Sequence, residues 1–298
     1  MSSSYVLVTA AYNEERFIEN TLLSVIAQTN RPVEWNIVSD ASTDRTDKII
    51  ESFSTRYSFI HLIRVMDEHP RNFSAQVNAI NVGIRELKTK DFDYIGNLDA
   101  DISIGPTYFS LLMDTFIAIP RLGLGGGAIY EKSPDGLFRA RKRNSIASVA
   151  HACQFFRRAC FEAIGGCYFP LPYGAADVYA EVTSRMNSWE VMSFPNMPVY
   201  HYRSTGSADN YLRNSFRQGR ADYSLGTLPL FELLRFVRRS FDRPYLISSL
   251  ARIAGFSLSY GMRTLRPVSS DFIQYIREEQ ANRVERLFWY RQEHRSIG

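Results

Sequence analysis

Short apolar runs alternate with amphipathic helical stretches over the first hundred residues, and this order restricts the chain to few folds. The apolar runs, each expected as a strand, span residues 6–10, 33–39, 59–65 and 94–98. Between them, apolar side chains recur at helical spacing, as in 18–26. Strands that alternate with helices form mainly parallel sheets through right-handed crossovers. The sequence therefore predicts an α/β fold with a Rossmann-like, mostly parallel central sheet flanked by helices.

The pattern changes beyond residue 120. We expect a strand over 122–130 that carries a glycine run, then a polar, basic loop over 133–144. Helices are expected over 157–164 and 176–187, and extended segments over 153–156 and 191–202; after residue 204 the spacing indicates helices alone. The sequence thus predicts an α/β domain over 1–205 and an α-helical C-terminal extension over 206–298.

The bulk composition limits the classes of protein. The chain has 298 residues, of which 45% are hydrophobic and 22% charged, as in ordinary globular proteins. Its first residues lack the pattern of a secretory signal, and the most apolar stretch, 245–262, contains Arg252. Three cysteines without a CxxC pair argue against disulfides or a zinc site. We therefore expect a cytoplasmic protein with free thiols.

Positive charge is concentrated at the C-terminal end. Residues 211–298 hold 15 Arg, no Lys and 8 acidic residues, which gives +7, whereas residues 1–210 sum to −3. In 230–239, one helical side is apolar and carries Leu230, Phe231, Leu233, Leu234 and Val237. The other side is charged and carries Glu232, Arg235, Arg238 and Arg239. Such a helix either packs on the domain or lies at a membrane interface. We expect no nucleic-acid partner and leave open a peripheral contact with the inner leaflet of the cytoplasmic membrane and a homo-oligomer.

Two carboxylates flank one small residue where the 94–98 run ends, in Asp99-Ala100-Asp101. Carboxylates this close repel each other unless a cation or a proton lies between them. Oxygen ligands suit a hard divalent ion that shares a phosphate, such as Mg²⁺ or Mn²⁺. Because open α/β sheets bind ligands at strand ends, the sequence predicts a metal and phosphate site here.

The first two strands end in residues suited to a nucleotide. Tyr12 offers a ring for stacking on a base, and Asp40 offers an acceptor for a base N–H or a ribose hydroxyl. Asp40 also suits a turn or a helix cap. The glycine-rich patterns of dinucleotide-binding and P-loop proteins are absent from these positions.

Several segments together resemble family 2 glycosyltransferases. They are TAAYNEERFIENTLLSVIAQT (9–29), VSDASTDRT (38–46), RNFSAQVNAINVGI (71–84), YIGNLDAD (94–101), FFRRACFEAIGG (155–166), Ala176-Asp177 and the strand that ends in His201. The resemblance covers about residues 5–205 and keeps the family order. It implies a GT-A fold and a metal-dependent, inverting transfer of a sugar.

The same resemblance implies a role for each matching residue. Those expected at the donor nucleotide are Ala10, Tyr12, Glu14, Asp40 and Asp99. Those expected at the Mg²⁺ or Mn²⁺ ion are Asp99, Asp101 and His201, and Asp177 would be the general base. Two departures are Ala176, where the family has Glu, and Ala10, where it often has Pro or Thr.

The resemblance also implies substrates. It favours a UDP-sugar donor, while Asp40 would equally suit another pyrimidine or a guanine. The acceptor that the resemblance implies is a hydroxyl of a glycan or lipid-linked glycan, in bacterial cell-surface polysaccharide biosynthesis. Gln218 is followed by Gly-Arg-Ala-Asp rather than by the Q-x-x-R-W pattern of processive relatives. We therefore expect a single addition rather than polymerisation.

Other interpretations stay open at this point. A sugar-nucleotide nucleotidyltransferase would need a glycine-rich, basic first loop, whereas 12–15 is acidic. A non-catalytic relative is favoured by Ala176 and opposed by the retained Asp99, Asp101 and Asp177. Asp177 also suits the first turn of any helix. His201 is also of a type that packs in a hydrophobic core. The glycine run would allow either close packing of backbone segments or the close approach of an acceptor. The basic run 139–143 could form a solvated loop or a lid.

Overall fold

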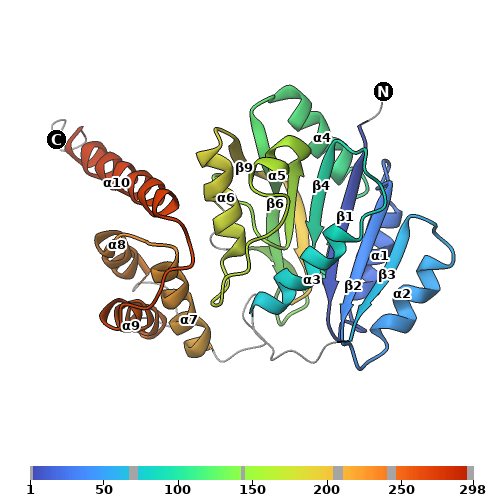
Figure 1. Cartoon of the computed structure of the whole chain (residues 1–298), viewed down its shortest axis with the longest axis horizontal. Coiled ribbons are helices and arrows are strands. Elements are labelled where there is room, and N and C mark those ends of the chain that lie inside the picture. The colour runs from blue at the N-terminus through green and yellow to red at the C-terminus, as the bar shows by residue number, and fades with distance from the viewer. Residues whose placement is uncertain (1–2, 67–72, 142–144, 204–210, 240–245, 294–298) are drawn as a thin grey trace. The chain divides into compact units, whose positions relative to one another are not determined.

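The computed structural model describes residues 3–66, 73–141, 145–203, 211–239 and 246–293 (Figure 1). The chain divides into two compact units. Unit 1 comprises residues 1–170 and 176–205, and unit 2 comprises 171–175 and 206–298. That unit 1 is a catalytic domain and unit 2 its extension remains a prediction.

Unit 1 begins with the expected alternation of strands and helices. Its first elements are β1 (Tyr5–Ala11), α1 (Ile18–Ile26), β2 (Glu34–Asp40), α2 (Thr46–Ser54), β3 (Ile60–Val65), α3 (Phe73–Arg85) and β4 (Tyr94–Leu98). The later ones are β5 (Ile102–Ile104), α4 (Tyr108–Ala118), β6 (Leu122–Lys132), β7 (Phe138–Ala140), β8 (Cys153–Arg157), α5 (Arg158–Ala163), α6 (Ala176–Met186) and β9 (Glu190–His201). The α/β class predicted from the sequence is confirmed.

The strands form one sheet in the order β3-β2-β1-β4-β8-β6-β9-β5, with β7 paired to β6. The pairs β3–β2, β2–β1 and β1–β4 are parallel, as the helical crossovers require. Beyond β4, β8 pairs antiparallel with both β4 and β6, and β5 pairs antiparallel with β9. The sheet is therefore parallel in its first half and mixed in its second.

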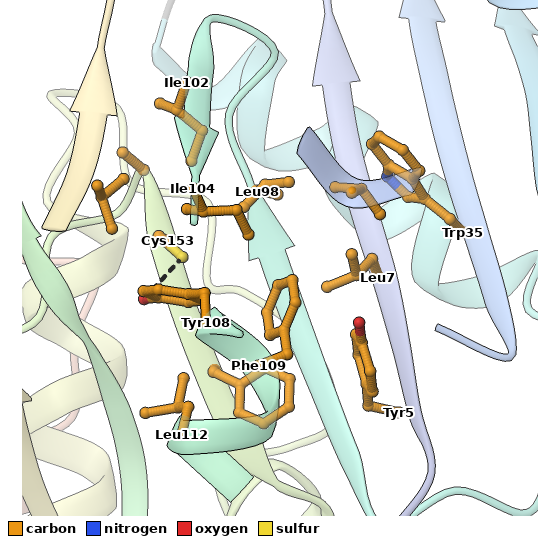
Figure 2. Close-up of a cluster of buried hydrophobic side chains, with 14 of the residues drawn as sticks. Tyr5, Leu7, Trp35, Leu98, Ile102, Ile104, Tyr108, Phe109, Leu112 and Cys153 are labelled. Carbon is orange, nitrogen blue, oxygen red and sulfur yellow. Dashed lines mark hydrogen bonds between the residues drawn. The ribbon is translucent and has the colours of Figure 1, made fainter. Parts of the chain in front are cut away.

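Each face of the sheet carries its own hydrophobic core, because alternate residues of a strand point to opposite faces. Tyr5 and Leu7 of β1 lie in the cluster that α1 and α4 cover. Val6 and Val8 lie in the other, with apolar residues of α3 and α5. Figure 2 shows the first cluster, in which Tyr108 meets Cys153 with 3.2 Å between Oη and Sγ. Because helices cover both faces of the sheet, the carboxyl ends of its strands are held in place by packing on either side.

The glycine run lies inside β6, where backbone segments come close. A Cβ added at Gly126 would lie 2.4 Å from the Cys153 carbonyl oxygen, and one at Gly127 would lie 2.0 Å from that of Met197. These approaches exclude any side chain. The glycine run therefore serves close packing of backbone segments, as one of the two interpretations held. The other interpretation, that an acceptor approaches Gly126 and Gly127, is wrong because this space is filled.

Two short strands differ from the expectations. β5 follows Asp101 directly and was not predicted, because three residues carry too little periodicity. β7 lies within the stretch 133–144 that we expected to be a loop, and Phe138 packs on Tyr200 with 5.1 Å between ring centroids. Of the basic run, Arg139 and Arg141 are described, whereas Lys142 and Arg143 lie outside the described residues.

Unit 2 is helical in its described part, as expected, with α7 (Tyr211–Ser224), α8 (Pro229–Arg239), α9 (Ile247–Gly261) and α10 (Ser270–Glu293). α7 and α9 touch backbone to backbone, since a Cβ at Gly255 would lie 2.0 Å from the Phe216 carbonyl oxygen. Among the described helices, none combines the length and apolar character needed to cross a membrane.

Helix α8 packs through its charged side and not through its apolar side. Glu232 on its polar side is 2% exposed, whereas Leu230 is 59% exposed. Glu232 lies against Arg235 and Arg252, so the charged side of α8 faces inward. The ion pairs outweigh the apolar pattern because arginines and acids of several helices meet there.

Candidate active site

The loops that follow β1 and β2 are joined by hydrogen bonds. Ala10 pairs with Val38, which aligns the two strand ends. The side-chain oxygen of Asn13 accepts from the Thr43 N–H at 2.8 Å, and Asn13 itself has a left-handed φ of 52°. This connection places Tyr12 and Asp40 just beyond two neighbouring parallel strands. The Tyr12 side chain is exposed, as a stacking platform must be.

The Asp99–Asp101 turn is held from both sides. The backbone N–H of Asp99 donates to the Ala152 carbonyl at 2.9 Å. The Thr21 hydroxyl of α1 lies 2.8 Å from the carbonyl oxygen of Ala100 and 2.7 Å from that of Ile102, and can donate to either. Because the backbone is fixed before and after Asp101, its carboxylate has a defined direction.

The β5–β9 pairing brings His201 to this turn. Ile102 pairs with His201, and the His201 Nε2 lies 3.1 Å from an oxygen of Asp101. Asp99, Asp101 and His201 each offer one ligand atom, and these atoms lie within 4.8 Å of one another. The predicted metal residues therefore meet although a hundred positions separate them, and such a set of two carboxylates and an imidazole suits Mg²⁺ or Mn²⁺.

Arg203 also joins this group, and the sequence carried no signal for it. Its Nε lies 2.7 Å from the second oxygen of Asp101, and its Nη2 pairs with Glu14. Burial alone would raise the pKa of Asp101, but His201 and Arg203 hold that pKa below its usual range. Arg203 thereby connects the end of β4 to the end of β1.

Among these residues, Glu14 carries a carboxyl group whose ionised form burial disfavours on balance. Burial, opposed by Arg203 and reinforced by Asp101 and Asp99, raises the pKa of Glu14 to about 7. Its second oxygen is buried and has no hydrogen-bond partner in the described part of the chain. Three carboxylates therefore face one guanidinium and one imidazole here. We call these five residues (Glu14, Asp99, Asp101, His201 and Arg203) the rim cluster; its excess of acid fits a cation.

His151 lies on the other side of Asp99 and was missed by the sequence analysis. Its Nδ1 is 3.7 Å from an Asp99 oxygen, and Gln76 donates to the same oxygen at 3.1 Å. Burial lowers the pKa of His151, but Asp99 and Asp177 outweigh burial and raise it overall. The carboxylate of Asp177 is thus close enough to His151 to affect its charge, which relates the expected base to the Asp99 turn.

Asp177 lies half-buried in the first turn of α6, and Glu181 follows one turn later. Glu181 accepts from the Ser148 hydroxyl at 2.8 Å and the Val149 N–H at 2.7 Å. Burial, together with the charge of Asp177, raises the pKa of Glu181 to about 8. Glu181 therefore ties α6 to the segment that carries His151.

Comparison with known proteins identifies the family. The model of the family described as "Glycosyl transferase family 2" matches residues 6–169, more than half of the chain. The chain belongs to this family. The glycosyltransferase is also 30% identical, over 126 residues, to the poly-beta-1,6-N-acetyl-D-glucosamine synthase of Staphylococcus aureus (strain COL). That alignment covers 42% of the chain but only 28% of the synthase.

Solved structures show the same fold. The mannosyltransferase PcManGT from Pyrobaculum calidifontis, in complex with GDP-Man and Mn²⁺, superposes with a TM-score of 0.59 at 14% identity and 89% coverage of both chains. S. aureus TarS 1–349 with UDP-GlcNAc gives 0.58 at 16% identity, covering 93% of this chain and 82% of that one. At such identities the likeness concerns the fold, and it confirms the expected GT-A fold.

The structure brings most of the predicted site residues of the glycosyltransferase to one edge of the sheet. Glu14, Asp99, Asp101 and His201 share the rim cluster. Ala10, Tyr12 and Asp40 lie at the neighbouring ends of β1 and β2, and Asp177 lies near His151. The individual roles of these residues remain predictions. Arg203, His151 and Glu181 are additions from the structure.

Proposed function

We propose that this glycosyltransferase moves a sugar from a nucleotide-diphosphate donor to a hydroxyl of a glycan or lipid-linked glycan, with inversion at the anomeric carbon. The observation that carries the proposal is the acid excess of the rim cluster, next to the ends of β1 and β2. A site that gathers three carboxylates around one guanidinium favours a cation and, through it, a diphosphate.

The ligands proposed for Mg²⁺ or Mn²⁺ are Asp99, Asp101 and His201. Once bound, such an ion would offset the charge that builds on the departing diphosphate. Arg203 already neutralises one oxygen of Asp101, and its guanidinium is a second group able to pair with phosphate oxygens. Mn²⁺ in the solved PcManGT complex supports a metal for the same fold.

We assign the nucleoside to the ends of β1 and β2. Tyr12 would stack on the base, and Asp40 would accept a hydrogen bond from the base N–H or from the ribose. The backbone of Ala10 borders the same place. We favour UDP, with which TarS was solved as UDP-GlcNAc. A guanine also offers an N–H to a carboxylate, and PcManGT was solved with GDP-Man, so the donor screen includes both nucleotides.

Asp177 is the proposed general base. A sugar hydroxyl is a weak nucleophile, so a carboxylate that takes its proton as the new bond forms lowers the barrier. One carboxylate, without a second nucleophile at the anomeric carbon, suits a single displacement and thus inversion. The effect of Asp177 on the pKa of His151 supports a place near Asp99.

The proposed setting is the cytoplasmic stage of bacterial cell-surface polysaccharide biosynthesis. The likeness to the poly-beta-1,6-N-acetyl-D-glucosamine synthase supports it. We propose a single addition, because the processive Q-x-x-R-W pattern is absent at Gln218. A homo-oligomer stays open.

The test compares Asp177→Asn with Asp271→Asn, since both aspartates lie in the first turn of a helix. A thermal-shift screen of nucleotide sugars with Mn²⁺ first identifies the donor. Asp177→Asn should keep the donor-induced shift and lose transfer by about 10²–10⁴-fold, the usual contribution of a general base. Asp271→Asn should keep both.

Two results would contradict the proposal. Transfer by Asp177→Asn at the wild-type rate would show that the base is misassigned. A wild-type protein whose melting temperature responds to no nucleotide sugar, with or without Mn²⁺, would favour the non-catalytic interpretation.

A further inference from the structure

Helix α8 turns its apolar side outward. Leu230, Leu233 and Val237 recur at helical spacing and are 59%, 49% and 51% exposed. In a helix that packs on a globular core, such residues lie inside. This arrangement therefore needs an explanation beyond the folding of unit 2.

Helix α9 repeats the arrangement. Ile247, Leu250 and Leu258 lie on one side of the helix and are 52%, 53% and 47% exposed. Just after the helix, Met262 and Leu265 are exposed as well. Two helices of one unit thus carry apolar stripes on their outer sides. We call the six helical side chains (Leu230, Leu233, Val237, Ile247, Leu250 and Leu258) the α8–α9 apolar surface.

The inner sides of both helices are charged. Arg235 of α8 lies 2.8 Å from Asp222 of α7, and Arg252 of α9 lies 2.5 Å from the same carboxylate. Glu232 completes the group, 3.1 Å from Arg235 and 3.3 Å from Arg252. We call these four residues the helical cluster. Because the inner positions are paired ions, the outer apolar residues are not a mispacked core.

The charges that accompany the apolar surface have one sign. Within the described residues 229–239 and 246–266, the acidic residue is Glu232, which is buried. Arg238 and Arg263 are exposed, and Arg239 and Arg266 are half-buried. The exposed residues of these two stretches therefore combine aliphatic side chains with cations.

We propose that the α8–α9 apolar surface docks this protein on an anionic lipid membrane, lying in the interface without crossing it. Aliphatic side chains enter the boundary between headgroups and acyl chains, while arginines pair with anionic headgroups. A second copy fits this surface less well, because a symmetric contact would bring arginines against arginines. The inference goes beyond the proposed reaction and does not depend on it.

The test is co-sedimentation of the full chain with vesicles, without donor or metal. Binding is expected to vesicles of phosphatidylcholine with phosphatidylglycerol, more weakly to phosphatidylcholine alone, and to fall as salt is raised. The variant Leu233→Ser/Leu250→Ser should bind at least about tenfold more weakly, since it places two hydroxyls in the apolar boundary. Arg238→Gln/Arg263→Gln should lose the preference for the anionic lipid.

The matched control is Leu111→Ser/Ile117→Ser, which removes two side chains of α4 in unit 1 that are also about half exposed. It should bind like the wild type. Because the substituted apolar residues are all exposed, each variant should melt close to the wild type. An unchanged melting temperature shows that a variant is folded before its binding is measured. Wild-type protein that stays in the supernatant with both vesicles overturns the proposal, as does equal binding by Leu233→Ser/Leu250→Ser. Sedimentation velocity that shows a dimer dissociated by the same variant would instead assign the surface to a second copy.

Discussion

Two groups of charges in this protein are built around carboxylates and arginines but differ in balance. The rim cluster of unit 1 sets Glu14, Asp99 and Asp101 against Arg203 and His201. The helical cluster of unit 2 sets Asp222 and Glu232 against Arg235 and Arg252. The first holds more acid than arginine, and the second is neutral.

We interpret the acid-rich rim cluster as a binding site and the neutral helical cluster as a structural support. In the helical cluster each carboxylate contacts two guanidinium groups, and the two negative charges are matched by two positive charges. In the rim cluster three carboxylates share one guanidinium and one imidazole, and burial raises the pKa of Glu14 to about 7. Because carboxylates gathered in excess repel one another, the rim cluster is the one of the two that a bound cation would stabilise, in line with the metal site proposed above.

The largest expected effect is on catalysis, through Asp101→Asn. The substitution removes one charge from the acid-rich group and weakens the proposed metal site. Transfer should fall by roughly 10³-fold or more, as when a group that stabilises transition-state charge is lost. The thermal shift produced by donor with Mn²⁺ should disappear, as it should for the wild type in a chelator.

The paired variant Asp222→Asn makes the same chemical change in the neutral cluster. It should lower the melting temperature and leave the donor-induced shift intact. If Asp222→Asn abolished the donor response while Asp101→Asn kept it, the assignment of site and support would be reversed.

The next effect is on stability and compares the arginine of each cluster. Arg252→Met leaves Asp222 and Glu232 with a single guanidinium, and breaking a buried pair costs about 3–5 kcal/mol. We expect calorimetry to show a melting temperature lower by roughly 10 °C. Arg203→Met should cost less, because Arg203 is 39% exposed.

Mn²⁺ distinguishes the two arginine variants. It should restore the stability of Arg203→Met, since a cation at the acid-rich group takes over the neutralising role of the guanidinium. It should leave Arg252→Met unchanged, because the helical cluster offers two carboxylates that both still contact Arg235, whereas the rim cluster offers ligand atoms of Asp99, Asp101 and His201 within 4.8 Å of one another. If Mn²⁺ restored the stability of both arginine variants equally, or of neither, the distinction between the two clusters would fail.

The sequence predicts these regions unequally, for physical reasons. The alternation before residue 98 encodes β1 to β4 locally, so that strand ends and the Asp99–Asp101 turn are visible in the chain. The place of His201 beside Asp101 depends on the β5–β9 pairing, and the resemblance to the family, not the spacing, suggested it. Arg203 and His151 act through contacts distant in sequence and carry no local signal.

The orientation of α8 shows how a local pattern misleads. An amphipathic helix usually packs with its apolar side inward, because burying apolar surface away from water is favourable. In unit 2 the partners of Glu232 come from α8 itself and from α9, and they make the charged side the inner one. A single-helix pattern does not contain those partners, so this part of the fold required the structure.

The smallest expected effect concerns Glu181, a buried carboxylate that belongs to neither cluster. Its pKa is raised to about 8, mainly by burial, from an ordinary value of 4.5. The folded state thus keeps a proton that the unfolded state releases above about pH 4.5, so the free energy of unfolding falls as the pH rises toward 8. Glu181→Gln keeps an oxygen for Ser148 and Val149 but does not titrate.

Glu181→Gln should therefore flatten the fall of stability between about pH 5 and pH 8, and near pH 8 it should melt a few degrees above the wild type. Urea unfolding across this range measures the slope, with Glu162→Gln on the exposed side of α5 as the control that keeps it. Asp177→Asn should reproduce part of the flattening, because the charge of Asp177 helps to raise the pKa of Glu181. Parallel slopes for wild type and Glu181→Gln would mean that Glu181 is ionised in the fold, and the acid excess near Asp177 would then be larger than the structure indicates.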